Sequence, residues 1–274
     1  FNRIAEYGTD KAGQILIVLL IIKLLDHACF DKEKKINNLL FLIPLLGLCI
    51  SLKTYFLPYL FLGFLLIFIN IKNSQILKKI FFSKSFLFFS ILLILNFSHH
   101  FISTGCIVSP LPYTCLGNAV IWGKDINVIY ELSIWLEQWA KAGAGPNFRV
   151  QNVSEYISNV QWVPNWIERY FFTKFLDQLA FLIFTFLLVL VFFKKIKFNS
   201  KISNIDKKTY YFFIILVIIF LIWFFKHPTL RYGGYSIVFL ILSIPISFIF
   251  EKFENRKSFN KKFIFLIILV AVLF

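Results

Sequence analysis

Long apolar runs separated by short polar links dominate this chain and limit the folds open to it. A helix needs roughly 20 apolar residues to cross a bilayer. Seven runs approach that length and an eighth stops at the last residue: 13–30, 38–51, 54–70, 85–102, 173–193, 209–225, 235–250 and 263–274. Because 59% of the residues are hydrophobic, a water-soluble core could not enclose them all. The pattern therefore predicts an all-α, polytopic membrane protein with about seven to eight spans.

Residues 103–172 form the one long segment that is not mainly apolar, and they contain five of the six tryptophans. We interpret this segment as a folded cap on one face of the membrane domain. It divides the chain into an N-terminal membrane part (1–102), the cap (103–172) and a C-terminal membrane part (173–274). Because the sequence starts at Phe1 and ends inside an apolar run, we expect it to be a fragment of a longer protein.

The formal net charge of +15 would suggest nucleic-acid binding in a soluble protein. Here 18 of the 29 basic residues lie in four short links that strict alternation places on one side of the membrane: 31–37, 71–84, 194–208 and 251–262. The positive-inside rule makes that side cytoplasmic, so the cap faces out. We therefore expect membrane lipid as a partner and no nucleic acid.

Cys106 and Cys115 close a short loop within the cap. In an oxidising compartment outside the cytoplasm they could form a disulfide, which the chain-entropy model values at about 3 kcal/mol. The alternatives are two free thiols or half of a metal site, but no histidine lies in the cap. We expect the disulfide, and we expect no metal.

Val128, Leu132, Trp135 and Trp139 recur at helical spacing and predict an amphipathic helix in the middle of the cap. The charged residues of the segment lie away from this stripe: Glu131, Glu137 and Lys141. Two interpretations stay open. The helix could lie flat on the bilayer, because tryptophan prefers the membrane interface. Alternatively, the stripe could pack inside the cap.

Ionisable residues collect at the outward mouths of the predicted spans: Arg3, Glu6, Asp10, Lys53, Asp177, His227 and Arg231. An enzyme that uses a lipid phosphate needs cations for the phosphate and a carboxylate base for the acceptor. Arg231 is the strongest candidate, because its planar fork can give a phosphate two parallel hydrogen bonds. For each residue the alternative is an interfacial position from which the charge reaches water.

The layout resembles the GT-C-type membrane glycosyltransferases that use polyprenyl-phosphate sugars. Those enzymes combine many spans with an outward cap and a catalytic carboxylate in the first outward loop. Arg231-Tyr232 is similar to the Arg-Tyr pair of their late outward turn, and Ser51-Leu52-Lys53-Thr54 resembles their short Lys-bearing turn. Four stretches look like an uncharacterised bacterial multi-pass family of the same general type: Glu6-Tyr7-Gly8-Thr9-Asp10, Gly13-Gln14, Gly105-Cys106 and Thr114-Cys115.

The resemblance implies an inverting transferase in the bacterial cytoplasmic membrane that moves a sugar from a polyprenyl-phosphate donor to an envelope glycan or lipid acceptor. Asp10 or Glu6 would act as base, unless the catalytic carboxylate lies upstream of the sequence. Arg231, Lys53 and His227 would hold the lipid phosphate, and no cofactor is implied. Two other classes stay open: an O-antigen polymerase or ligase, and a multi-pass transporter. A transporter should show charged groups near the membrane midplane and repeated halves, and the sequence shows few such charges and no repeat.

Overall fold

The computed structural model describes residues 9–25, 36–69, 74–145, 148–176, 180, 183–184 and 207–233. This part of the chain is helical apart from one pair of two-residue strands. Before the cap come α2 (Thr9–Leu25), α3 (Ile36–Leu52), η2 (Thr54–Tyr59), α4 (Leu60–Ile69), α5 (Ser74–Phe81) and α6 (Lys84–Thr104). The cap and the segment after it contain η3 (Pro112–Thr114), η4 (Gly117–Ala119), α7 (Ile126–Ala140), β1 (Ala144–Gly145), β2 (Phe148–Arg149), α8 (Val153–Ser158), α9 (Trp162–Trp166) and η5 (Ile167–Phe175). The last described elements are α11 (Lys207–Lys226) and η6 (Leu230–Tyr232).

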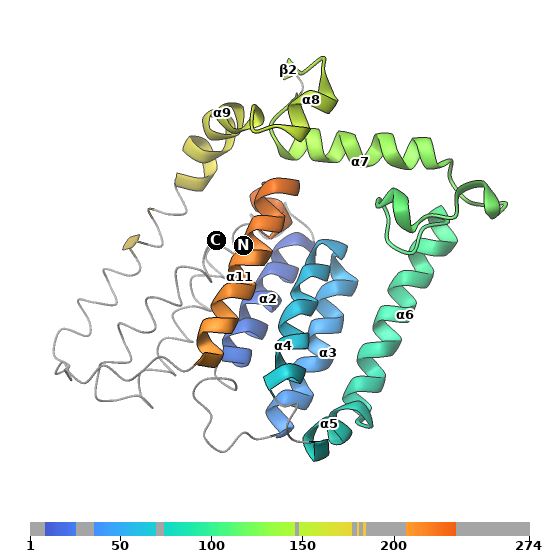
Figure 1. Ribbon diagram of the computed structural model, residues 1–274, viewed down its shortest axis with the longest axis vertical. Coiled ribbons are helices and arrows are strands. Elements are labelled where there is room, and N and C mark those ends of the chain that lie inside the picture. Colours follow the sequence, from blue (N-terminus) through green and yellow to red (C-terminus); the bar gives the residue numbers. More distant parts are fainter. Residues whose placement is uncertain are drawn as a thin grey trace.

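A bundle of α2, α3, α4 and α11 occupies the centre of the molecule (Figure 1). Its core includes Ile17, Leu46, Leu62 and Leu216, all of which are buried. The same core continues into the cap through Tyr156, Trp162 and Trp166. The bundle and the cap therefore share one apolar interior.

The α6 helix begins and ends at clear capping residues. Ser83 Oγ accepts a hydrogen bond from the Phe86 backbone N–H at 3.1 Å, which satisfies one donor of the first turn. Gly105 follows the last turn with φ = 76°, a left-handed conformation that glycine adopts without strain. These two residues explain why α6 starts and stops where it does.

Close contact holds α6 against α3. A Cβ at Gly47 of α3 would lie 2.9 Å from Phe89 Cδ2 and 3.4 Å from Phe89 Cα, so only glycine fits here without displacing α6. Ser51 Oγ donates to the Leu92 carbonyl at 3.3 Å across the same interface. On the other side of α6, Leu87, Ile94 and Leu95 are each 62% exposed.

The prediction of seven to eight membrane spans is wrong. Within the described residues, α6 is the one helix that is long and apolar enough to cross a bilayer, and the apolar stretches of the other helices have 10–17 residues. At 1.5 Å per residue, 17 residues reach about 25 Å, less than the ~30 Å of the hydrocarbon core. Pro44 interrupts the hydrogen bonding of α3, and Pro58 lies in η2, where the third apolar run begins as a 3₁₀-helix. Most of the run predicted at 173–193, and all of the runs predicted at 235–250 and 263–274, lie outside the described residues.

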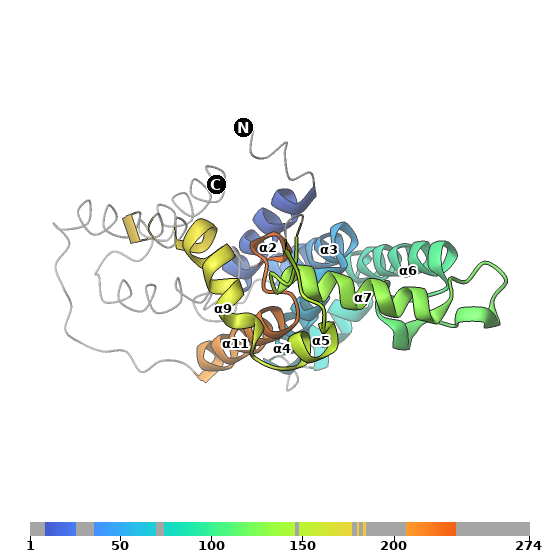
Figure 2. The same ribbon diagram turned by 90° about the horizontal axis from the view of Figure 1, so that it is seen from above.

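The cap crosses the end of the bundle opposite α5. Its longest helix, α7, runs across the ends of the upright helices (Figures 1 and 2). Asp125 caps the start of α7 by accepting from the Asn127 backbone N–H at 2.8 Å. Cys106 and Cys115 form a disulfide with an S–S distance of 2.09 Å, which closes the loop before α7.

A short hairpin follows α7. In it, β1 and β2 pair antiparallel, with Ala144 opposite Arg149 and Gly145 opposite Phe148. The buried Gln138 side chain of α7 donates to the carbonyls of Gly143, at 2.9 Å, and Val150, at 3.3 Å. This amide therefore fixes the hairpin against the end of α7.

Candidate functional site

Three segments that are distant in sequence meet at the cap end of the bundle. The Tyr55 ring, just after Lys53, stacks on Tyr232 with a centroid distance of 4.0 Å and an interplanar angle of 14°. The His227 ring meets Tyr55 edge-on at 4.9 Å. Tyr232 in turn packs edge-on against Trp139 of α7, with a centroid distance of 6.3 Å. The two turns expected at the outward face are thus in direct contact with each other and with the cap.

The start of α2 belongs to the same cluster. The buried Gln14 side chain donates to the Leu230 carbonyl in η6 at 3.2 Å. Asp10 lies one helical turn before Gln14 on α2, so the helix brings its backbone to this end of the bundle. Its side chain and the whole of Glu6 lie outside the described residues.

The basic candidates are only partly described. Lys53 is half-buried at the start of η2, and its backbone N–H donates to the Cys49 carbonyl at 3.2 Å. Arg231 is the middle residue of η6, between Leu230 and Tyr232, while its side chain lies outside the described residues. The backbones of both residues lie at the cap end of the bundle.

His227 lies in an environment that keeps it neutral. Burial lowers its pKa to about 4, and the nearby positive charge of Lys226 acts in the same direction, while Glu137 acts against it. Its Nδ1 atom is buried without a hydrogen-bond partner among the described residues. At neutral pH His227 would therefore carry no charge and would interact with a polar group through a hydrogen bond.

A buried ion pair lies within the cap, and an exposed lysine of α11 links it to the bundle. Lys141 is 2% exposed, and its Nζ donates to Glu137 Oε1 at 2.6 Å and to the Ile157 carbonyl at 2.7 Å. The other oxygen of Glu137, Oε2, lies 3.7 Å from Nζ of Lys226 at the end of α11. The sequence indicates that Glu137 and Lys141 lie away from the apolar stripe, but it does not predict that they are buried. Helical spacing cannot show that α8 and α11 pack against that side of α7.

The apolar stripe of α7 is largely open. Trp135 is 46% exposed, and Val128 and Leu132 on the same stripe are also exposed, while Trp139 at its end contacts Tyr232. The interpretation in which the stripe packs inside the cap is therefore wrong for these three exposed residues.

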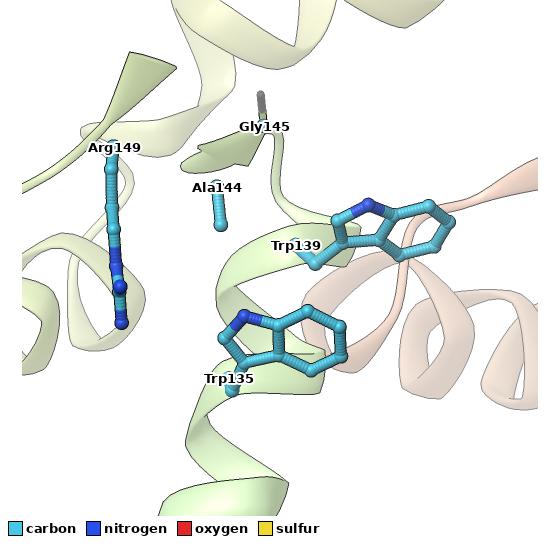
Figure 3. Close-up of a pocket in the computed structure, with 5 residues that line it drawn as sticks. All are labelled: Trp135, Trp139, Ala144, Gly145 and Arg149. Carbon is cyan, nitrogen blue, oxygen red and sulfur yellow. The ribbon is translucent and has the colours of Figure 1, made fainter. Parts of the chain in front are cut away.

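A hollow of about 260 Å³ lies beside the end of the stripe. Its lining comes from α7 and the hairpin: Trp135, Trp139, Ala144, Gly145 and Arg149. Figure 3 shows the two indoles on one side and the extended Arg149 side chain on the other, with Ala144 between them. The sequence does not reveal this hollow, because Arg149 reaches it only through the pairing of β1 with β2.

Chemically, the cap end combines groups suited to an anionic, ring-bearing ligand. Aromatic faces lie next to guanidinium and ammonium groups, and both kinds of group meet where short turns leave the bundle. Guanidinium groups bind phosphate and carboxylate in a fixed planar geometry.

Comparison with known proteins adds a family but no activity. No curated protein and no solved structure matches the chain. Residues 1–238 match the family model described as a domain of unknown function (DUF8201). Because this match covers well over half of the 274 residues, the chain belongs to the DUF8201 family.

Proposed function

We propose that this protein is a membrane-bound, glycosyltransferase-like enzyme of the bacterial cytoplasmic membrane. It moves a sugar from a polyprenyl-phosphate donor to an envelope glycan or lipid acceptor. The observation that carries the proposal is the meeting of the Lys53 turn, the 226–232 turn and the first turns of α2 beneath the aromatic cap. Such a site needs cations, a carboxylate and aromatic surface in one place, and these segments carry all three.

The exposed surface of α6 supports membrane binding. Its 21 residues reach about 31 Å as a helix, which matches the hydrocarbon thickness. No residue of α6 is fully buried, and Leu87, Ile94 and Ile102 are strongly exposed. An apolar helix face that is open from one end of the helix to the other requires a nonpolar surrounding, and lipid provides it. The open stripe of α7, which lies across the end of the bundle, is suited to the interface of the same bilayer.

In this proposal each group has a distinct role. Asp10 or Glu6 takes the proton from the acceptor hydroxyl as the new glycosidic bond forms. Arg231 and Lys53 stabilise the departing lipid phosphate, whose bond to the sugar carbon breaks in the same step. His227, neutral at pH 7, donates a hydrogen bond to that phosphate. The aromatic rings of the cap exclude water from the reacting centre.

Transfer of labelled sugar from polyprenyl-phosphate glucose or polyprenyl-phosphate mannose, by the full-length protein in membranes, tests the proposal. Arg231→Ala should lower the rate by about a hundredfold, since a lost contact to a departing anion costs on the order of 3 kcal/mol. Arg231→Lys should restore little, because a point charge cannot reproduce the planar fork.

Lys124→Gln is the matched control, because Lys124 is an exposed cation of the cap outside the cluster. It should transfer sugar at the wild-type rate. If Arg231→Ala also transfers at the wild-type rate at equal protein level, Arg231 has no role in transfer. If the unaltered protein transfers neither sugar while its membrane level is normal, the transferase proposal fails for these donors.

A further inference from the structure

Arg149 in the cap hollow has no role in the arrangement described so far. Its side chain is exposed, and among the described residues it takes part in no ion pair. The carboxylate of Glu137, on the same helix as the two indoles, is already held by Lys141 and Lys226. An arginine that lines a hollow with its charge uncompensated is available for an anionic ligand.

We propose that this hollow binds one sugar residue that carries an anionic group, a phosphate or a carboxylate. The indole of Trp135 forms an apolar wall with one face open, which suits the C–H face of a sugar ring. Arg149 stands on the opposite side and supplies the two parallel donors that a phosphate or carboxylate accepts (Figure 3). The ligand therefore lies with its ring on the indoles and its anion on the guanidinium.

The size of the hollow suits a ligand part of about one ring. About 260 Å³ lies just below the roughly 300–1,000 Å³ of pockets that enclose drug-sized ligands. The wall at Gly145 is backed by a second guanidinium, because a Cβ there would lie 3.6 Å from Nη1 of Arg169. Arg169 is itself held over the Phe148 ring at 4.2 Å. The positive potential of this wall thus comes from two arginines on either side of one hairpin.

Trp139 connects the hollow to the cluster of turns. It lines the hollow, and its ring also contacts Tyr232 at 6.3 Å. A sugar bound beside Trp139 would have its ring next to the segment that carries Arg231. We therefore assign the hollow to the saccharide end of a substrate of the proposed transfer, and this assignment rests on the proposed function.

Isothermal titration calorimetry of the purified full chain in detergent tests the binding without any catalysis. The probes are glucose 1-phosphate, glucuronate, glucose and inorganic phosphate. Glucose 1-phosphate or glucuronate should bind, and glucose and inorganic phosphate should each bind at least tenfold more weakly, because each retains half of the contacts. Arg149→Gln should weaken binding of the anionic sugar by about tenfold or more, the usual effect of losing a charge-assisted hydrogen bond.

Two exposed residues offer matched controls. Lys124→Gln removes a cation from the cap outside the hollow, and Tyr130→Leu removes an exposed aromatic ring from another face of α7. Both variants should bind the anionic sugar (glucose 1-phosphate or glucuronate) as the wild type does, whereas Trp135→Leu should bind it more weakly. If Arg149→Gln binds as the wild type does, or if inorganic phosphate binds as tightly as glucose 1-phosphate, the assignment is overturned. Tight binding by a protein that transfers no sugar would refute the transferase proposal and leave the sugar site standing.

Discussion

His227 is the residue whose titration is most altered by the fold. Because burial lowers its pKa to about 4 from the ordinary 6.5, the folded state holds it neutral while an unfolded chain protonates it. Above pH 6.5 His227 is mostly neutral in both states, so its titration does not change the free energy of unfolding. Stability falls as the pH drops from 6.5 towards 4, by up to about 3 kcal/mol from this one group.

His227→Phe isolates this effect, because phenylalanine keeps a ring against Tyr55 and Tyr232 but cannot titrate. We expect the melting temperature of the wild type to drop more steeply between pH 6.5 and 4.5 than that of the variant. Other titrating groups, Glu137 included, are present in both proteins and cancel in the comparison. Parallel pH profiles would show that His227 is protonated as easily in the fold as in water.

Glu137 neutralises the buried ammonium group of Lys141 in the cap. Glu137→Gln would leave the buried ammonium of Lys141 without a charged partner, held by the Ile157 carbonyl and the Trp162 ring, and would loosen the link to Lys226. Breaking one side of a buried pair costs about 3–5 kcal/mol. Thermal unfolding in detergent should show this loss. Glu131→Gln, an exposed position on the same helix, should change stability by less than about 0.5 kcal/mol.

At the scale of the elements, the close contact between α3 and α6 depends on Gly47, which has no side chain. Gly47→Ala places a methyl group 2.9 Å from the Phe89 ring and 3.4 Å from its Cα, so α6 must shift. Gly63→Ala in α4 meets only the flexible end of Leu46 at 3.2 Å. Both changes gain the same helix propensity, so their difference reports packing. Gly47→Ala should be less stable than Gly63→Ala by about 1–3 kcal/mol, as judged by thermal unfolding. Equal stabilities would mean that the helices separate without cost.

The exposed face of α6 gives the second test at this scale. Ile94 is 62% exposed and lies at the middle of the helix. Ile94→Arg should reduce the amount of protein that resists carbonate extraction from membranes, because a charge at the centre of a spanning helix costs about 2.5–3.5 kcal/mol. Phe82→Arg, in the turn before α6, should leave extraction unchanged. Equal extraction of the two variants would remove the argument that α6 contacts lipid.

At the scale of the whole molecule, the cap and α5 lie at opposite ends (Figure 1). Single cysteines can report on the two ends in a chain whose Cys29 and Cys49 are replaced by alanine. Tyr113→Cys in the cap, where the side chain is 82% exposed, should react with an impermeant thiol reagent in intact spheroplasts. Phe82→Cys, 89% exposed beside the basic α5, should react only after permeabilisation. The reverse result would invert the orientation that the basic links predict.

Local sequence signals were enough for several features of this molecule. The helical spacing of Val128, Leu132 and Trp135 predicts α7, and the apolar run at 85–102 predicts α6. The alternation of basic links predicts that the Lys53 turn and the 226–234 turn share one end with the cap, and the contacts of Tyr55 with His227 and Tyr232 agree with that. Such features depend on residues that are near one another in the chain.

Tertiary packing decided the rest. The hydrogen bond from Gln14 to Leu230 joins residues 216 positions apart, and no periodicity in either segment encodes it. The burial of Lys141 and the hollow beside Arg149 arise only when α7, the hairpin and α8 fold together. The number of membrane-length helices was overestimated for a related reason. Hydropathy records which residues avoid water, but the length of a helix also depends on where Pro44, Pro58 and the neighbouring helices break or tighten its hydrogen bonds. Apolar composition follows from the sequence alone, whereas the partner that covers each apolar face, another helix or lipid, follows from the packing of the whole chain.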